Sequence, residues 1–266
     1  MLSFWPFLYS LDDCGGTLSL PLFVLPRGLL PECEEPLRIF EPRYKQMMDD
    51  CVLDDVPFGY CMVDVGSSRP QGWSEPLEYG CLARVEDVRE EGSNLLCTAN
   101  GHGRFKIKKI IPAALDYENF GMIFPPVSDL EKRYRDDNPT GKLYLRAEIE
   151  LIEPPTGTPS EVQWNELASV WAENVILFQK LVGQPSSSLE DTFGYIEEIF
   201  TQPFPGRFWH AGNMLLETDE ERQKALSAET WDEIISLMHE SLVHRRLKVE
   251  AMVKFAQTSL SSYEEE

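Results

Sequence analysis

The sequence predicts an α+β protein in which strands come first and helices follow. Two observations carry this prediction. Apolar residues alternate with polar ones in the first half of the chain, and they recur at helical spacing after residue 160. A segment rich in Pro, Gly and Thr, 153–161, separates the two patterns. We therefore expect a β-rich subdomain over residues 18–152 and a helical subdomain over residues 160–257.

Each expected strand is a run of aliphatic, aromatic or β-branched residues bounded by turn residues. The runs are 18–25, 37–40, 58–65, 81–88, 95–99, 104–111, 120–124 and 143–152. Gly101-His102-Gly103 is expected to form a turn between two of these strands, and 66–76 is expected to form a loop. Glu41-Pro42 opens a helix that stops by Asp55, because proline is tolerated at the first helical position.

Helices are expected throughout the second half. Apolar stripes at a spacing of 3.6 residues predict helices over 164–181, 189–200 and 208–216. Thr218 and Thr230 are each followed three residues later by glutamate, which is the capping-box pattern. Each of these threonines is therefore expected to precede a further helix.

Acidic residues outnumber basic ones along the whole chain. The sequence holds 45 Asp plus Glu against 24 Lys plus Arg, a formal net charge of −21. A phosphate backbone or an anionic membrane attracts a cationic surface, so neither nucleic acid nor membrane is an expected partner. No stretch approaches 18 apolar residues, so no membrane-spanning helix is expected.

The cysteines lie far apart in sequence. They are at positions 14, 33, 51, 61, 81 and 97, and no two are closer than ten residues. This spacing excludes C-x-x-C pairs for zinc or redox chemistry. We expect reduced, buried thiols, and therefore a cytoplasmic protein.

Motifs of common catalytic sites are absent. The sequence contains no G-x-x-x-x-G-K-[ST] phosphate loop, no G-x-S-x-G nucleophile turn and no H-E-x-x-H metal motif. Carboxylates are too abundant for any pair to be singled out. The sequence therefore predicts no catalytic residue, no cofactor and no metal site, and the protein is not expected to be an enzyme.

A basic cluster is formed by Arg104, Lys106, Lys108 and Lys109. On a strand, residues 104, 106 and 108 share one face, opposite Phe105. A solvated outer face is the expected role of this cluster. The alternative is a contact with an acidic partner or with an acidic patch of this same chain.

Three segments occur in an order that is specific. The segment Leu20-Pro21-Leu22-Phe23-Val24-Leu25-Pro26 is followed by Leu37-Arg38-Ile39-Phe40-Glu41-Pro42-Arg43-Tyr44 and then by Gly101-His102-Gly103-Arg104-Phe105-Lys106-Ile107. Together they resemble the Lon protease N-terminal domain family, over roughly residues 18–256. The positions carried over from its motifs, as structural or binding residues, are Ile39, Phe40, Glu41, Pro42, Arg43, Tyr44, Gly103, Arg104 and Phe105.

The resemblance implies a PUA-like β pseudo-barrel followed by a C-terminal helical bundle. It also implies a non-catalytic module that binds proteins or peptides, such as an adaptor in protein quality control or proteolysis. Its expected partners are unfolded or tagged polypeptides, or a protease. Full-length Lon proteases continue into an AAA+ ATPase and a Ser-Lys peptidase domain, and this chain is expected to be a stand-alone domain without either. The alternative is a PUA-like RNA-binding module, supported by the basic cluster and opposed by the net charge.

One structural hypothesis concerns two charges within the motifs. Glu41 and Arg104 lie beside the aromatic residues Phe40 and Phe105. A charge flanked by core aromatics is commonly half-buried and needs a partner. We expect either that the two pair and hold the helix against the barrel, or that each faces water.

Overall fold

The computed structural model describes residues 19–264, with side-chain surroundings up to Phe255. Contacts divide the chain into two units, Met1–Pro154 and Pro155–Glu266, and each unit is described by itself. The division falls in the Pro/Gly/Thr-rich segment 153–161. The apolar N-terminus and Cys14 lie outside the described residues.

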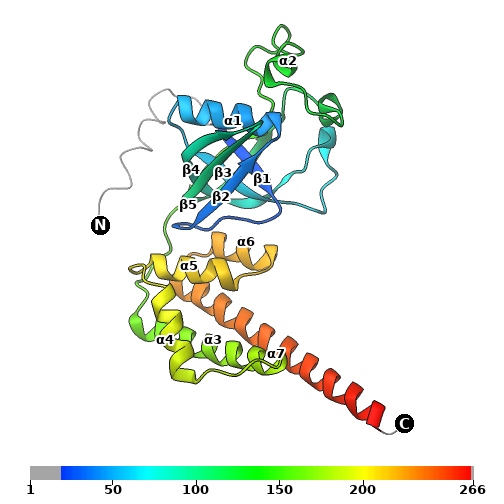
Figure 1. The fold of residues 1–266 in the computed structure, drawn as a ribbon. Helices are drawn as coiled ribbons and strands as arrows, with labels where there is room; N and C mark the ends of the chain where they lie inside the picture. The colour runs from blue at the N-terminus through cyan, green and yellow to red at the C-terminus, as the bar shows by residue number, and fades with distance from the viewer. Residues whose placement is uncertain (1–18, 265–266) are drawn as a thin grey trace. The chain divides into compact units, whose positions relative to one another are not determined.

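The described part of the first unit contains six strands (Figure 1). They are β1 (Ser19–Leu25), β2 (Glu34–Ile39), β3 (Phe58–Val63), β4 (Pro76–Glu91), β5 (Asn94–Ile111) and β6 (Arg146–Ile152). Helix α1 (Pro42–Leu53) follows β2, and the short helix α2 (Val127–Glu131) lies between β5 and β6. Two 3₁₀ turns, Pro70–Gly72 and Tyr117–Phe120, lie in the connections.

The strands form one mixed sheet that closes on itself. Its order is β2-β5-β4-β3-β1-β6, and β5 also pairs with β6, so every strand except β2 belongs to a closed ring. β1 and β3 are parallel, whereas the other pairs are antiparallel. One edge of the long strand β5 pairs with two strands in turn. β2 pairs with the first half of β5, as far as Asn100, and β6 pairs with the second half, from Arg104 onward. β2 is therefore an edge strand.

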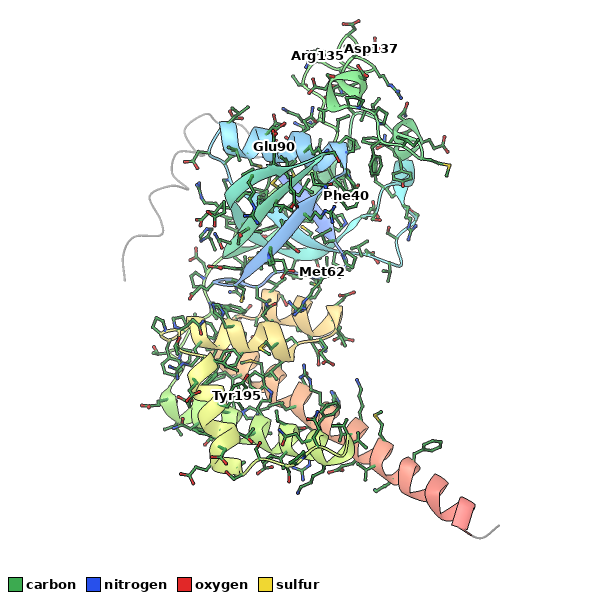
Figure 2. The ribbon with its side chains drawn as sticks, in the orientation of Figure 1. Phe40, Met62, Glu90, Arg135, Asp137 and Tyr195 are labelled. Carbon is green, nitrogen blue, oxygen red and sulfur yellow. The ribbon has the colours of Figure 1, made fainter. Side chains whose placement is uncertain are left out.

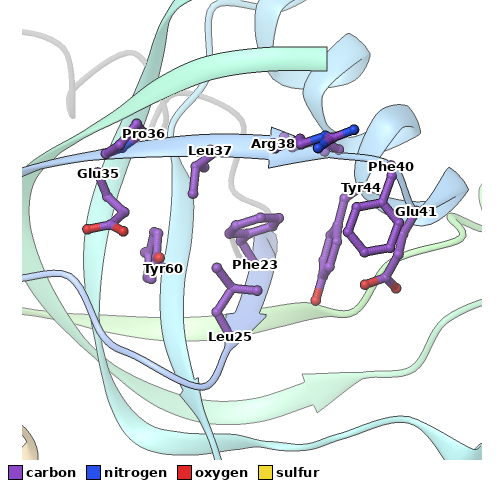
Figure 3. Close-up of a pocket in the computed structure, with 11 residues that line it drawn as sticks. Phe23, Leu25, Glu35, Pro36, Leu37, Arg38, Phe40, Glu41, Tyr44 and Tyr60 are labelled. Atoms are coloured by element: carbon purple, nitrogen blue, oxygen red, sulfur yellow. The ribbon is translucent and has the colours of Figure 1, made fainter. Parts of the chain in front are cut away.

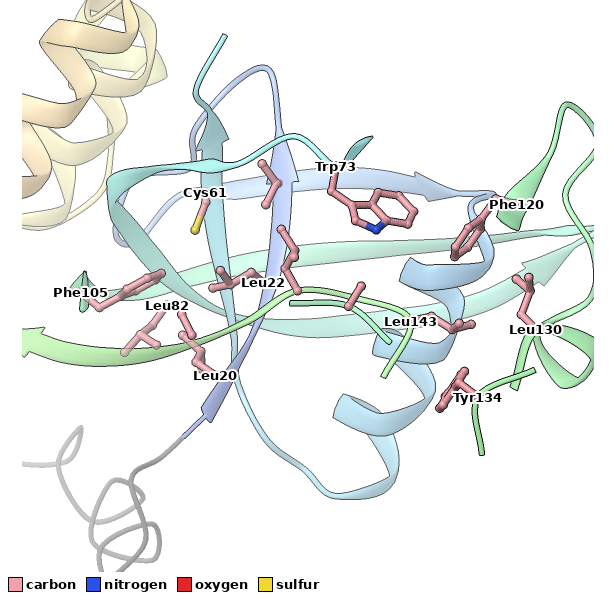
Figure 4. Close-up of a cluster of buried hydrophobic side chains, with 14 residues drawn as sticks. Leu20, Leu22, Cys61, Trp73, Leu82, Phe105, Phe120, Leu130, Tyr134 and Leu143 are labelled. Carbon is pink, nitrogen blue, oxygen red and sulfur yellow. The ribbon is translucent and has the colours of Figure 1, made fainter. Parts of the chain in front are cut away.

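The core of the first unit lies inside the ring and extends beyond one end of it, toward α2 (Figure 4). Leu20, Leu22 and Val24 point into it, because alternate side chains of a strand face the same side. The other buried residues of this core are Cys61, Trp73, Leu82, Phe105, Ala113, Phe120, Leu130, Tyr134, Leu143, Leu145 and Ala147. Phe23 faces the opposite side, where α1 covers it through an edge-on contact with Tyr44.

The structure corrects one expected turn and one expected strand. β5 runs unbroken from Asn94 to Ile111, so the expected turn at Gly101-His102-Gly103 is wrong. Leu82 pairs with Gly103 and Ala83 with Gly101, which leaves His102 in a β-bulge. Residues 120–124 do not form the expected strand: Gly121 has φ 63°, which an extended strand does not adopt.

The described part of the second unit is entirely helical apart from its connections. Its helices are α3 (Glu161–Leu181), α4 (Leu189–Ile199), α5 (Gly206–Leu215), α6 (Asp219–Ser227) and α7 (Trp231–Glu264). The capping box predicted at Thr218 is confirmed, since its side chain accepts from the backbone N–H of Glu221. Thr230 accepts from the N–H of Glu233 in the same way, at 3.2 Å.

Aromatic side chains form much of the interior of the helical unit. Trp164 and Phe208 meet edge-on with ring centroids 5.6 Å apart, and Trp171 lies 5.2 Å from Phe200. These residues belong to the apolar stripes of α3 and its neighbours. Arg222 of α6 is also buried, and it donates to the side-chain and backbone oxygens of Asn213.

Candidate functional site

A groove of about 270 Å³ lies between β2 and the outer face of β1 and β3 (Figure 3). Tyr44 of α1 stands at one end of the groove, and Glu35 of β2 stands at the other. The remaining lining residues are Phe23, Leu25, Pro36, Leu37, Arg38, Ile39, Phe40, Glu41 and Tyr60. Four of the residues that line the groove, Ile39, Phe40, Glu41 and Tyr44, belong to the predicted motifs.

The floor of the groove is a packed aromatic cluster. The ring of Phe23 meets Tyr44 edge-on at 4.3 Å between centroids and meets Tyr60 at 5.6 Å. All three rings are buried, and Phe58 supports Phe23 from below at 6.0 Å. Aromatic pairs in this geometry hold one another in place, so the apolar surface of the groove is preformed.

Tyr44 is fixed by hydrogen bonds to the backbone of β1. Its hydroxyl donates to the carbonyl of Val24 at 3.0 Å and accepts from the N–H of Val24 at 3.2 Å. On this edge of β1 the ladder with β6 ends at Pro21, and Leu22 donates to the carbonyl of Leu145. Among the described residues, no strand pairs with Val24 on this edge, and the Tyr44 hydroxyl bonds to its backbone instead. Burial raises the pKa of Tyr44 to about 12, so the hydroxyl stays protonated.

Arg43 joins the groove end to the loop that follows β3. Its Nε donates to Glu41 Oε2 at 2.8 Å, so the charge of Glu41 is compensated. The guanidinium lies over two rings, 4.1 Å from the centroid of Tyr44 and 4.4 Å from that of Trp73. Arg43 therefore positions Tyr44 and Glu41 and leaves little of its own charge for a ligand.

The rim of the groove is apolar and exposed at Phe40. This side chain is 54% exposed at the end of β2 (Figure 2), and its ring stacks on Phe124 at 6.3 Å. The residues just before Phe124 are Met122 and Ile123, and both are almost fully exposed. The positive φ of Gly121 starts this loop, so an apolar loop continues from the rim.

β2 presents an unpaired edge beside the groove. It pairs with β5 on one side, and no strand of the described residues pairs with its other side. Pro36 lies in the middle of β2, and proline is tolerated there because an edge strand has one side without a ladder. The missing N–H of Pro36 limits addition of a regular strand, so side-chain contacts in the groove would carry most of any binding.

The structure separates the predicted motif residues into two places. Ile39, Phe40, Glu41 and Tyr44 line the groove, and Arg43 supports it. Pro42 is the first residue of α1, as predicted.

The other motif segment, Gly103-Arg104-Phe105, lies in β5 away from the groove. Phe105 is fully buried. Its ring packs so closely on Gly59 and Gly80 that a Cβ at either glycine would lie within 2.6 Å of it. This part of the motif is therefore structural.

Arg104 and Glu41 do not pair with each other. Arg104 is only 3% exposed and donates to the backbone carbonyl of Glu153, while Glu41 binds Arg43. Burial lowers the pKa of Arg104 to about 10, and the side chain remains charged near neutrality. For Arg104, the expected pair with Glu41 and the expected exposure to water are therefore both wrong.

The lysines of the basic cluster bind glutamates of this same chain. Lys106 pairs with Glu78 at 2.9 Å, Lys109 pairs with Glu148 at 3.0 Å, and Lys108 pairs with Glu150. Of the roles considered for the basic cluster, the structure supports contact with acidic residues of this same chain. These pairs neutralise the charge that a nucleic acid would need.

No group of His, Cys, Asp and Glu within residues 19–264 is arranged to hold a metal ion. Cys33, Cys51, Cys61, Cys81 and Cys97 are buried free thiols. Burial raises the pKa of Cys51 to about 12 and that of Cys97 to about 11, so both are protonated at neutral pH. Among the described helices, none has the length and apolarity that crossing a membrane requires.

The sequence pattern did not indicate the part of the groove that Phe23, Leu25, Glu35 and Tyr60 form. The alternation of β1 gives one signal, since Phe23 and Leu25 face away from Leu22 and Val24. It indicates an apolar outer face, but only the crossing of β2 and α1 turns that face into a groove.

Known proteins share this sequence pattern and fold. A family model described as the ATP-dependent protease La (LON) substrate-binding domain matches residues 19–245. A Lon N-terminal domain protein from Xanthomonas campestris is similar in structure, with a TM-score of 0.51, 21% identity and coverage of 84% of this chain and 98% of that chain. The N-terminal domain of the Mycobacterium avium complex Lon protease has a TM-score of 0.50, 11% identity and coverage of 85% and 98%. At these identities the structural likeness establishes a shared fold.

Proposed function

This chain belongs to the Lon substrate-binding domain family, and from that premise we propose that it binds polypeptide segments in the groove between β2 and the outer face of β1 and β3. The family supplies the substrate-recognition role. The groove supplies a place for it, because Phe23, Tyr44 and Tyr60 form a rigid apolar floor that is open along β2.

The chemistry of the groove favours unfolded polypeptide over folded protein. Folded proteins keep most large apolar side chains inside, whereas an unfolded chain exposes them. A groove of about 270 Å³ takes one or two such side chains, and its open length beside β2 suits an extended segment. Pro36 and the charged side chains of β2 restrict ladder pairing, which favours side-chain recognition over open-ended strand addition.

The wider role that we propose is that of an adaptor. The chain would bind unfolded or tagged polypeptides and present them to a protease, without ATP hydrolysis or peptide cleavage of its own. A cytoplasmic location fits this role and the five buried free thiols of the described residues. We also infer that the ring of strands corresponds to a PUA-like pseudo-barrel, and the second unit to a helical bundle. The pairing of the lysines on β5 with glutamates argues against the RNA-binding alternative.

Binding of fluorescein-labelled casein, an unfolded polypeptide, tests the proposal by fluorescence anisotropy. Phe40→Glu places a charge on the apolar rim and should weaken binding about ten-fold, as expected for losing the burial of one large apolar side chain. Phe40 is exposed, so this variant should fold normally, which far-UV circular dichroism checks.

Leu53→Glu is the matched control. Leu53 is a large exposed apolar residue of the same unit that does not line the groove, and the substitution adds the same charge. It should leave the affinity for casein within about two-fold, since isolated surface substitutions have small effects. Equal losses for the two variants, or no binding of casein by the unaltered chain, would refute the proposed function.

A further inference from the structure

Glu35 is placed to contact whatever enters the groove. Alternation along β2 puts Glu35, Leu37 and Ile39 on one face of the strand. Leu37 and Ile39 are buried on that face, and Glu35 continues their row at the open end. Its carboxylate lies beside Tyr60 in the view along the groove (Figure 3).

Within the described residues, the carboxylate of Glu35 is half-buried without a compensating charge. No hydrogen bond or ion pair involves its side chain within the part of the chain that the structure describes. Glu41 at the other end of the groove differs, since Arg43 binds it at 2.8 Å. Arg38, the remaining charged residue of the lining, lies on the opposite face of β2 and is exposed.

A carboxylate in this setting favours a cationic partner. Partial burial removes water from a charged group, and an opposite charge with hydrogen-bond donors restores the lost interaction. Lys and Arg also carry apolar stems, which can lie along Leu37 and Tyr60 while the charged end reaches Glu35. The same groove offers Phe23 to a neighbouring apolar side chain.

We propose that Glu35 makes the groove selective for extended segments that carry Lys or Arg two residues from a large apolar side chain. The spacing follows from β2, because side chains two positions apart on an extended segment face the same side and match the row of Glu35, Leu37 and Ile39. This proposal rests on the proposed function and adds a sequence preference to it. The preference also has a kinetic component, since a chain of net charge −21 attracts cationic segments.

Three fluorescein-labelled peptides of equal length test the proposal by anisotropy at physiological salt. Each has a Gly/Ser frame with one central sequence: Lys-Ser-Phe-Ser-Lys, Gln-Ser-Phe-Ser-Gln or Glu-Ser-Phe-Ser-Glu. The symmetric design makes the direction of binding irrelevant. The Lys peptide should bind about three- to ten-fold more tightly than the Gln peptide, and the Glu peptide should bind most weakly.

Two charge-matched variants locate the origin of the preference. Glu35→Gln should bring the affinities for the Lys and Gln peptides within about two-fold of each other without weakening the Gln peptide. Glu34→Gln removes the same charge from the exposed face of β2 and should keep the preference. Thermal unfolding of both variants confirms that they are folded.

The possible failures are distinct. Equal binding of the Lys and Gln peptides by the unaltered chain overturns the selectivity but leaves the proposed function standing. Equal loss of preference in Glu35→Gln and Glu34→Gln also overturns it, because the effect would then be the diffuse charge of the chain. If none of the three peptides binds and casein does not bind either, the proposed function fails and this proposal fails with it.

Discussion

The hydroxyl of Tyr44 takes the place of a strand partner for Val24. It bonds to both the N–H and the carbonyl of Val24, which is buried. An unpaired buried backbone group destabilises a protein by about 1–3 kcal/mol. The tyrosine of the I-F-E-P-R-Y segment is therefore required for its oxygen as well as for its ring.

Replacing Tyr44 by Phe should thus reduce the free energy of unfolding by about 1–3 kcal/mol in urea, with the aromatic packing kept. Tyr117→Phe is the control, since Tyr117 is partly exposed and contacts Trp73 through its ring. The control should change stability by less than about 0.5 kcal/mol. Similar results for the two variants would mean that the bonds to Val24 contribute nothing.

Arg104 and Glu41 should act independently of each other. Arg104→Met removes a buried guanidinium and its hydrogen bond to the backbone carbonyl of Glu153, and should destabilise the chain by about 1–3 kcal/mol. Glu41→Gln keeps an acceptor for Arg43 but removes the charge of this part-buried pair, and should cost about 1–2 kcal/mol. In a double-mutant cycle measured by urea unfolding, the coupling should be near zero. A coupling above about 1 kcal/mol would show that the two charges interact after all.

At the level of elements, local patterns predicted the helices better than the strands. The caps at Thr218 and Thr230 are local signals and mark real helix starts. The failure in β5 has a physical reason: a bulge and a turn both favour glycine, and only the partner strand distinguishes them. The expected strand at 120–124 failed because the backbone of Gly121 has a positive φ, which hydropathy does not reveal.

The two glycines in the middle of β5 should respond differently to substitution. A Cβ at Gly101 would lie 2.5 Å from the backbone carbonyl oxygen of Leu30, whereas a Cβ at Gly103 would meet only Leu82, at 3.5 Å. Gly101→Ala should therefore destabilise the chain by about 1–3 kcal/mol, and Gly103→Ala should be nearly neutral. Thermal or urea unfolding of the two variants compares them directly. Equal stabilities would contradict a continuous β5 packed against Leu30, and would suit the turn that the sequence suggested.

The candidate site was only half visible in the sequence, for a topological reason. The segment from Ile39 to Tyr44 forms one end of the groove and is contiguous in the chain. Phe23 and Tyr60 come from other strands, and they meet this segment only because β2 crosses the outer face of the ring. Arg104 and Phe105 belong to the same resemblance, but their burial gives them a structural role.

For the molecule as a whole, the burial of neutral thiols and phenols makes the free energy of unfolding fall at alkaline pH. The pKa of Cys51 is raised from 9.0 to about 12, that of Cys97 from 9.0 to about 11, and that of Tyr44 from 10.0 to about 12. Above pH 9 the unfolded chain loses these protons and the folded chain keeps them. Stability is therefore fully present below about pH 9 and falls as the pH rises toward 12.

Each group whose pKa is raised by burial should make the unfolding free energy fall more steeply with pH, by up to about 1.4 kcal/mol per pH unit. Cys51→Ala removes one of them. The slope of its unfolding free energy against pH, measured between pH 9.5 and 11 by urea unfolding, should be shallower than that of the unaltered chain by about this amount. Parallel slopes would show that the Cys51 thiol ionises equally in the folded and unfolded states.

Hydrogen–deuterium exchange with and without saturating casein tests the central claim, that the groove beside β2 binds polypeptide. Exchange should become slower in the segments that line the groove, above all residues 34–44, because a bound chain covers the free edge of β2. Exchange in the helical unit should stay the same, and Phe40→Glu should remove most of the protection. Protection confined to residues 155–264, or saturated binding that leaves residues 34–44 unchanged, would show that the polypeptide does not bind in this groove.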